Sequence, residues 1–209
     1  MRLPTQNRNA RTVYKYQKFE LSSKLLLKLN RFMEEKVILV DENDNEIGTE
    51  EKIKAHKEGK LHRAFSIFIF NSRGEMLLQK RSKDKYHSAG LWSNACCSHP
   101  RPNESLEEAI HRRLKEEMGF DCNLKKAFHF IYKVEFENGL KEHEFDHVFV
   151  GIYDGKVNPN PEEAEDFKWV SLETLTKDVE ANGEKYTYWF KVALPKVLEF
   201  WEKAKNDEK

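Results

Sequence analysis

Five histidine and glutamate residues are spaced so that they can form one metal site. Glu142 and Glu144 are separated by one residue, so on a β-strand both carboxylates project from the same face. His56 falls on a predicted short helix, and His62 opens the strand that follows. Together with His99, three imidazoles and two carboxylates suit a five- or six-coordinate Zn²⁺, Mn²⁺ or Mg²⁺ ion. Taken singly, each residue has a plainer interpretation as a solvated side chain, because spacing alone does not show that scattered residues converge.

A thiol lies close to one of these residues in the sequence. Cys97 precedes His99 by two positions, so in an extended segment the two side chains face the same way. The chain has three cysteines, two of them adjacent, which is a poor basis for a disulfide framework. We therefore expect a protein of the reducing cytoplasm with at least one functional thiol.

Residues 105–118 predict an amphipathic helix whose inward face carries charge. Ser105 and Glu108 form a capping box at its start. On a helical wheel, Arg113 and Glu117 fall within the stripe of apolar residues that must face the core. An inward charge is costly unless it is paired or meets a ligand or metal, which favours a polar site beneath the helix. The alternative is an ordinary i,i+4 ion pair, worth about 0.3 kcal/mol.

A scaffold of strands mixed with helices must position these residues. Strands are predicted at 37–40, 63–70, 75–81, 126–136, 142–153 and 167–170, an extended segment at 92–99, and helices at 50–58, at 105–118, after 171 and from 187. Turn residues at 71–74 and 138–139 predict two hairpins. We find no repeat or low-complexity segment, so the pattern predicts one α/β sandwich.

Composition and charge exclude several classes of protein. Of the 209 residues, 39% are hydrophobic and 34% are charged, which is typical of a globular chain. Thirty-six basic residues balance thirty-six acidic ones, so no global charge favours nucleic acid. No apolar run approaches the ~20 residues that cross a bilayer. Residues 1–36 carry nine Lys or Arg against three Asp or Glu, so we expect a basic extension with an amphipathic helix at 1–35 and one domain at 36–209.

The charged helix resembles a diphosphate-binding motif, the Nudix box. The matching residues are Glu104-x7-Arg112-Arg113-Leu114-Lys115-Glu116-Glu117-Met118-Gly119. In that motif the helix holds a divalent metal against a diphosphate. Two positions depart from it, because Ser98 stands where the box opens with Gly, and Arg113 replaces the Glu that normally follows the Arg. The lost carboxylate weakens the metal array that activates water, so the resemblance implies the fold but not hydrolysis.

Further motifs lie outside this helix. They are Lys52-x3-His56, Leu61-His62-Arg63-Ala64-Phe65-Ser66, Trp92-Ser93-Asn94-Ala95-Cys96-Cys97-Ser98-His99-Pro100 and Glu142-His143-Glu144. Together they resemble the type I isopentenyl-diphosphate Δ-isomerases. The match runs in order over residues 36–200 and is more specific than any single motif. It implies a Nudix-type α/β/α sandwich with a mixed β-sheet. It also implies an isomerase that interconverts isopentenyl and dimethylallyl diphosphate by a 1,3-allylic proton shift in isoprenoid biosynthesis.

The resemblance assigns expected roles to residues of this sequence. Cys97, Glu144, Tyr132 and Trp189 would be catalytic; His56, His62, His99, Glu142, Glu144 and Glu117 would bind metal; Lys52, Arg81, Lys85 and Arg113 would bind the substrate diphosphate. Glu117 would hold the Mg²⁺ that accompanies the diphosphate, and the other metal ligands would hold a further Zn²⁺, Mn²⁺ or Mg²⁺. The partner would be a small prenyl diphosphate, with no nucleic acid and no membrane span, and the oligomeric state stays open. Ala89 departs from the family, whose members commonly carry Pro before Gly90.

The implied reaction adds a proton to C4 of an alkene and removes one from C2, so it needs an acid and a base on opposite sides of the double bond. A thiol and a metal-bound carboxyl can serve. We expect Cys97, near cationic groups, to be more acidic than a free thiol. Two other functions stay open. Arg113 and the Cys97–His99 pair speak against a Nudix pyrophosphohydrolase, and a non-catalytic Nudix-like binding module leaves the inward charges without a purpose.

Overall fold

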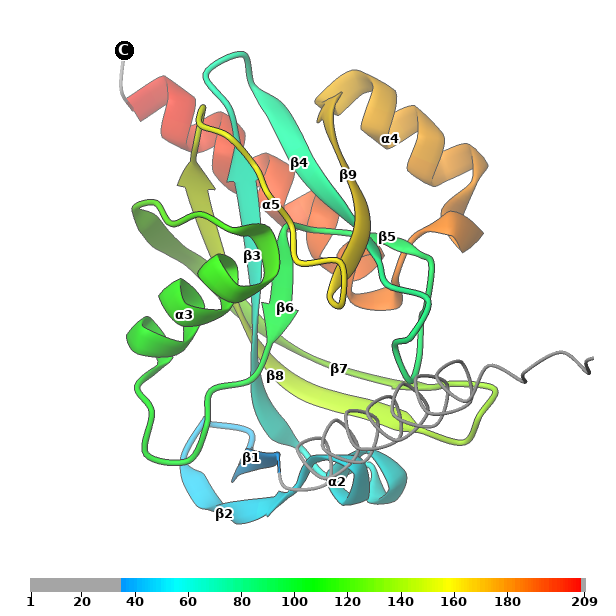
Figure 1. Cartoon of the computed structure of the whole chain (residues 1–209). Helices are drawn as coiled ribbons and strands as arrows, with labels where there is room; N and C mark the ends of the chain where they lie inside the picture. The colour runs from blue at the N-terminus through cyan, green and yellow to red at the C-terminus, as the bar shows by residue number, and fades with distance from the viewer. Residues whose placement is uncertain (1–34, 208–209) are drawn as a thin grey trace, which may run out of the picture.

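Residues 35–207, which the computed structural model describes, form a nine-stranded mixed sheet with helices on both faces (Figure 1). The strands are β1 (Lys36–Val40), β2 (Glu46–Glu51), β3 (His62–Phe70), β4 (Glu75–Arg81), β5 (Trp92–Ser93), β6 (Cys96–Ser98), β7 (Leu124–Glu135), β8 (Lys141–Ile152) and β9 (Ala164–Ser171). The helices are α2 (Lys52–Glu58), α3 (Leu106–Met118), α4 (Leu172–Ala181) and α5 (Tyr188–Asp207), with a 3₁₀ turn at Gly183–Lys185. The predicted α/β/α sandwich is confirmed. The predicted helix of the basic extension lies outside the described residues.

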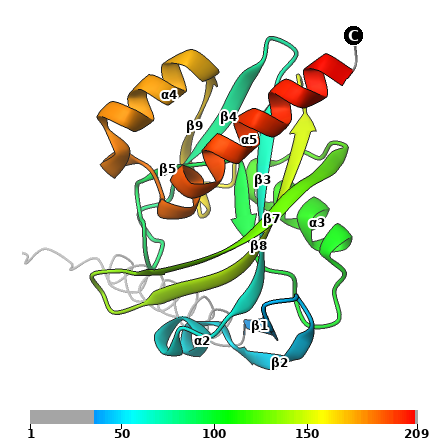
Figure 2. The ribbon, with the colours of Figure 1, turned by 180° about the vertical axis from the view of Figure 1, so that it is seen from behind.

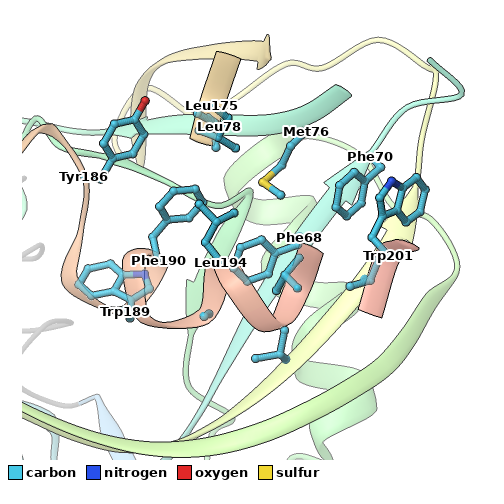
Figure 3. Packing of buried hydrophobic residues seen from close by; sticks show 14 of the residues in the cluster. Phe68, Phe70, Met76, Leu78, Leu175, Tyr186, Trp189, Phe190, Leu194 and Trp201 are labelled. Carbon is cyan, nitrogen blue, oxygen red and sulfur yellow. The ribbon is translucent and has the colours of Figure 1, made fainter. Parts of the chain in front are cut away.

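Strand β3 is the centre of this sheet. It runs parallel to β8 and antiparallel to β1, β4 and β6. Its buried side chains alternate between the two faces, so that Phe65 and Ile69 join the core beneath α3, while Phe68 and Phe70 join the core beneath α5. Trp201 of α5 stacks on Phe70 with ring centroids 3.9 Å apart (Figure 3). Figure 2 shows α5 crossing the face opposite α3. Because both faces are closely packed, β3 is a rigid base for the side chains at its ends.

The predicted elements are present close to their predicted ends, except in one segment. Residues 46–51 form β2, paired antiparallel with β1, whereas the sequence predicted a helix from residue 50. Charged residues dominate this strand and its apolar alternation is weak, so the pairing with β1 decides its conformation. The extended segment 92–99 is divided into β5 beside β4 and β6 beside β3. Of the helices between residues 35 and 207, none combines the length and apolarity needed to span a membrane.

Helix α3 begins and ends where its capping residues predict. The Ser105 side chain accepts a hydrogen bond from the Glu108 N–H, and Glu108 accepts one from the Ser105 N–H, which completes the capping box. Gly119 ends the helix with a φ of 74° in the left-handed region. Beyond β8, the Asn160 N–H donates to the carbonyl of Glu117 at 2.8 Å. The end of α3 and the loop before β9 are therefore fixed to each other.

We expect Gly119→Ala to destabilise the protein by ~1–3 kcal/mol more than Gly139→Ala. Both glycines have a positive φ, of 74° and 79°, so an alanine at either position carries a similar backbone strain. Only at Gly119 would the new Cβ lie 2.3 Å from a backbone atom, the Asn158 carbonyl oxygen; at Gly139 nothing lies within 4 Å. Urea unfolding of both variants measures the difference. Equal losses of unfolding free energy in the two variants would show that the loop at Asn158 moves to accommodate the new methyl group at little cost.

Candidate active site

The strand register brings several of the predicted site residues to one face of the sheet. His62 of β3 lies opposite Glu144 of β8, which in turn lies opposite Tyr132 of β7. On the other side of β3, Ser66 lies opposite Cys97 of β6. Because side chains separated by two residues share a face, these positions project together toward the α5 side of the sheet.

Four of the predicted metal ligands form a buried group. One ligand atom from each of His56, His62, His99 and Glu144 lies within 4.8 Å of the others. His56 and His62 each have Nδ1 2.8 Å from a backbone carbonyl, of Lys52 and Lys60 respectively, which leaves Nε2 as the atom that faces the group. The Nε2 atoms of both rings are buried without a hydrogen-bond partner.

These residues fit a divalent metal ion. A hydrogen bond at Nδ1 that leaves Nε2 free is the usual arrangement of a metal-binding histidine. Burial, followed by the neighbouring rings of His62 and His99, lowers the pKa of His56 to about 3, so that this imidazole is neutral. Burial also lowers the pKa of His99. Neutral imidazoles with unpaired buried nitrogens are suited to bind a cation.

Tyr132 connects the two predicted carboxylate ligands. Its hydroxyl lies 2.7 Å from Glu144 Oε2 and 3.0 Å from Glu142 Oε2. Burial, with the Glu144 charge next, raises the pKa of Glu142 well above its ordinary value. Burial would also raise the pKa of Glu144, but the imidazoles of His62 and His99, whose Nε2 atoms lie 3.5 and 3.0 Å from Oε1, outweigh it and hold that pKa well below the ordinary value. The pKa values of two carboxyl groups on one strand face are therefore shifted in opposite directions. Glu142 belongs to a separate group with His56 and His87.

Cys97 lies in a network that the sequence did not predict. Its thiol donates to the Asn94 side-chain oxygen at 3.0 Å and lies 3.4 Å from Ser66 Oγ, whose hydroxyl donates to Asp146 at 2.7 Å. Burial, followed by the Asp146 charge, raises the pKa of Cys97. The prediction of a thiol more acidic than free cysteine is therefore wrong. Lys52, Lys85 and Arg113 are paired with carboxylates, and the ionisable group that reaches Cys97 through Ser66 is the carboxyl of Asp146.

Three of the predicted diphosphate-binding residues carry acidic partners. Lys52 Nζ donates to Glu35 at 3.0 Å. Glu163 forms an ion pair with both Lys85 and Arg113, and its contact with Arg113 is 3.2 Å. Burial would raise the pKa of Glu163, but Lys85 and Arg113 lower it to about 2. The cations are thus held in place by carboxylates.

Arg113 and Glu117 face inward, as the helical wheel predicts. Arg113 Nη2 lies 2.6 Å from Glu117 Oε1, and only 4% of Glu117 is exposed. Gln79 of β4 donates to the other Glu117 oxygen at 3.0 Å. Glu117 therefore lies on the α3 side of the sheet. It belongs to neither of the candidate metal groups found among residues 35–207, and its role with Mg²⁺ stays a prediction.

Arg81 and Trp189 form a cationic and aromatic wall. The Arg81 guanidinium carbon lies 5.0 Å from the centre of the Trp189 ring. Arg81 also donates to the backbone carbonyl of His87 at 3.3 Å. This fourth predicted diphosphate ligand thus lies beside the loop 82–91 and beside the indole predicted near the hydrocarbon.

Sequence reasoning missed several residues of this region. Asp146 continues the alternation begun by Glu142 and Glu144, so the strand pattern contained a signal for it. His87 and Glu163 lie in loops, where no periodicity predicts the direction of a side chain.

Comparison with known proteins identifies the family. Residues 60–190 match the family described as the NUDIX domain. The chain is 57% identical over 166 residues to isopentenyl-diphosphate Delta-isomerase 2 of Aromatoleum aromaticum, covering 79% of this chain and 88% of that protein. It is 52% identical over 158 residues to isopentenyl-diphosphate Delta-isomerase of Serratia proteamaculans, covering 76% and 88%. The chain belongs to the isopentenyl-diphosphate Δ-isomerase family.

Solved structures that resemble the fold are more distant in sequence. DR0079 from Deinococcus radiodurans matches with a TM-score of 0.59 at 19% identity, covering 71% of this chain and 90% of that one. The MutT protein of Methanosarcina mazei matches with a TM-score of 0.54 at 24% identity, covering 71% and 96%. At these identities the likeness shows the Nudix fold alone. The isomerase relatives, by contrast, cover most of the chain at much higher identity.

We expect Glu144→Gln to weaken divalent-metal affinity by on the order of 100-fold, because it removes the charged oxygen beside three imidazoles. Asp146→Asn is the matched control, since it replaces a buried carboxyl group on the same strand face that belongs to neither candidate metal group. Competition of each variant with a chromophoric chelator for Zn²⁺ or Mn²⁺ measures the affinity. Wild-type affinity in Glu144→Gln would remove this residue from the metal site.

Proposed function

We propose that this enzyme interconverts isopentenyl diphosphate and dimethylallyl diphosphate by moving a proton onto C4 and another off C2. One observation carries the proposal. Cys97 and Glu144 project from the same face of the sheet, and Glu144 lies among the imidazoles of a candidate metal site. Membership of the isomerase family supports the same assignment.

The positions of Cys97 and Glu144 suit a short alkene between them. Their partners on β3, Ser66 and His62, are four residues apart, or roughly 13 Å along the strand. A separation of this order would accommodate a five-carbon chain between the two groups. One group gives a proton to one side of the double bond while the other accepts a proton from the second side. Tyr132, hydrogen-bonded to Glu144, would hold that carboxylate in position and exchange a proton with it.

The imidazole-rich group would hold a divalent cation, for which Zn²⁺ and Mn²⁺ suit the nitrogen donors better than Mg²⁺. When bound, that cation supplies a fixed positive charge that orients Glu144 and tunes its basicity. His56, His62, His99, Glu142 and Glu144 are the proposed ligands. Glu117 on the α3 side is the proposed partner of the Mg²⁺ that accompanies the substrate diphosphate, as its place in the Nudix helix implies.

The diphosphate would take the place of carboxylates. Lys52, Lys85 and Arg113 are paired with Glu35 and Glu163, so they form a preassembled set of cations. Phosphate oxygens can compete for these cations because they carry more charge and accept bidentate hydrogen bonds from Arg. Binding the charged end in this way would orient the hydrocarbon toward Cys97.

Trp189 would face the hydrocarbon end. Its ring already lies beside a cation, the Arg81 guanidinium. A tertiary carbocation at C3 would gain about 2 kcal/mol from such an indole face if water is excluded. With only 3% of its surface exposed, Trp189 is suited to exclude water.

The cysteines of the described chain are free, which supports the reducing cytoplasm as the proposed location.

We expect Cys97→Ala to lower the isomerisation rate by about 10²–10⁴-fold, because it removes one of the two proton-transfer groups. Cys96→Ala is the matched control, since Cys96 faces the α3 core on the other side of the sheet and removal of its thiol leaves the catalytic face intact. Proton NMR of isopentenyl diphosphate in deuterium oxide follows both the double-bond shift and the incorporation of deuterium.

The same samples separate the isomerase from a Nudix hydrolase. Phosphate release from a panel of nucleoside diphosphate derivatives, without deuterium incorporation into the prenyl substrate, would reject the proposed reaction. Equal losses of isomerisation in Cys96→Ala and Cys97→Ala would instead mean that the wrong thiol is assigned.

A further inference from the structure

His87 is a buried imidazole of the loop 82–91 that the family resemblance leaves without a role. Only 6% of its surface is exposed. Its ring stacks on Phe136 with centroids 4.6 Å apart and an interplanar angle of 8°. On another side it lies 6.0 Å from the ring of His56 and 5.9 Å from that of Trp189. The ring is therefore held in one orientation beside the metal group.

The Nε2 atom of His87 points into an acidic and imidazole-lined space. It lies 3.0 Å from Glu142 Oε1. The two atoms do not align as donor and acceptor, so that Nε2 stays without a hydrogen-bond partner although it is buried. A short contact of this kind, out of hydrogen-bond geometry, is expected where two electron pairs converge on one cation.

The contact at Nδ1 of His87, on the opposite side of the ring, is of the kind found in metal-binding histidines. His87 Nδ1 lies 3.3 Å from the Ser88 hydroxyl, much as Nδ1 of His56 and His62 lies against a backbone carbonyl. The carbonyls at His56 and His62 can only accept from Nδ1–H, and the Ser88 hydroxyl can do the same at His87, which leaves Nε2 for a ligand. Ligand atoms of His56, His87 and Glu142 lie within 4.8 Å of one another, and His56 is shared with the group formed by His62, His99 and Glu144.

We propose that His87 is an additional ligand of the metal centre. It would bind the ion together with Glu142 and with His56, the residue that the two groups share. The centre then has four imidazoles, a donor set that favours Zn²⁺, Co²⁺ or Mn²⁺ over Mg²⁺. The proposal rests on the metal centre proposed above.

This ligand would tie the metal centre to the diphosphate-binding residues. Lys85 lies two positions before His87 on the same loop, and Arg81 donates to the His87 backbone carbonyl at 3.3 Å. A cation that holds the His87 ring would therefore also fix the part of the loop that presents Lys85. Loss of the ligand should loosen this connection as well as weaken metal binding.

The test compares His87→Phe and His87→Gln with the wild-type protein. Phenylalanine keeps a flat ring against Phe136 and removes both nitrogens, whereas glutamine keeps polarity and loses the stack. We expect both variants to bind Co²⁺ at least about tenfold more weakly, in competition with a chromophoric chelator, and to change the visible absorption of bound Co²⁺. His129→Phe is the control, because His129 is an exposed imidazole outside both candidate metal groups. Far-UV circular dichroism and thermal unfolding verify that each variant is folded.

Wild-type Co²⁺ affinity and an unchanged spectrum in a folded His87→Phe would overturn the proposal and leave His87 a packing residue. Equal weakening in His129→Phe would overturn it too, because the effect would not be specific to His87. The result is independent of turnover. If the wild-type protein failed to isomerise isopentenyl diphosphate while His87→Phe still weakened Co²⁺ binding, the proposed reaction would be rejected and the ligand retained.

Discussion

The parallel register between β3 and β8 is the constraint on which the candidate site depends. It sets His62 opposite Glu144 and Ala64 opposite Asp146, and β8 in turn sets Tyr132 of β7 beside Glu144. A slip of one residue would turn every one of these side chains to the other face, where the apolar core beneath α3 lies. The cores on both faces of β3 prevent such a slip. The packing of Phe65 and Phe68 on opposite sides is thus part of what positions the imidazoles.

Burial of so much charge is tolerable because the charges are paired. Lys52 with Glu35, and Arg113 with both Glu117 and Glu163, form partly buried ion pairs in which neither charge is left alone. Breaking such a pair leaves a buried charge without a partner, which costs a large free energy. The cation therefore stays paired until another anion replaces the carboxylate. A diphosphate is an anion of this kind. The carboxylates therefore keep the cations assembled without making them unavailable.

The elements that could be predicted from the sequence are those whose own periodicity decides them. Helix α3 was predicted with its capping box and with Arg113 and Glu117 inward, because the wheel depends only on local spacing. Strand β2 was missed because its conformation comes from pairing with β1, and its own pattern is weak. The convergence of His56 with His62 and His99 required the tertiary structure, although spacing already gave Glu142 and Glu144 one face.

The electrostatic environment of Cys97 was the part least open to prediction. The sequence contains many basic residues near the site, and their number favoured an acidic thiol. What matters is which ionisable group lies next to the sulfur, and Asp146 reaches it through Ser66, from a strand position 80 residues beyond Ser66. The spacing on β8 gives Asp146 the same strand face as Glu144, but it does not show that this face lies beside Cys97 of β6. The raised pKa follows from burial first and from that carboxylate second.

In the proposed reaction, one face of the sheet would bind the diphosphate and the other would carry the groups that transfer protons. Cys96 and Cys97 are adjacent, so β6 directs one thiol into the core beneath α3 and the other to the α5 side. The Nudix helix, with Arg113 and Glu117, remains on the first side, while the thiol proposed for proton transfer is on the second.

Glu163 contacts both Arg113 of α3 and Lys85 of the loop 82–91, so a chain of charges passes from one side to the other. A substrate whose anionic end is held along that chain would extend its hydrocarbon onto the α5 side. In the proposed reaction the Nudix helix would serve binding rather than hydrolysis. The carboxylate that Arg113 replaces is missing from its metal array, and the opposite face would supply the acid and the base.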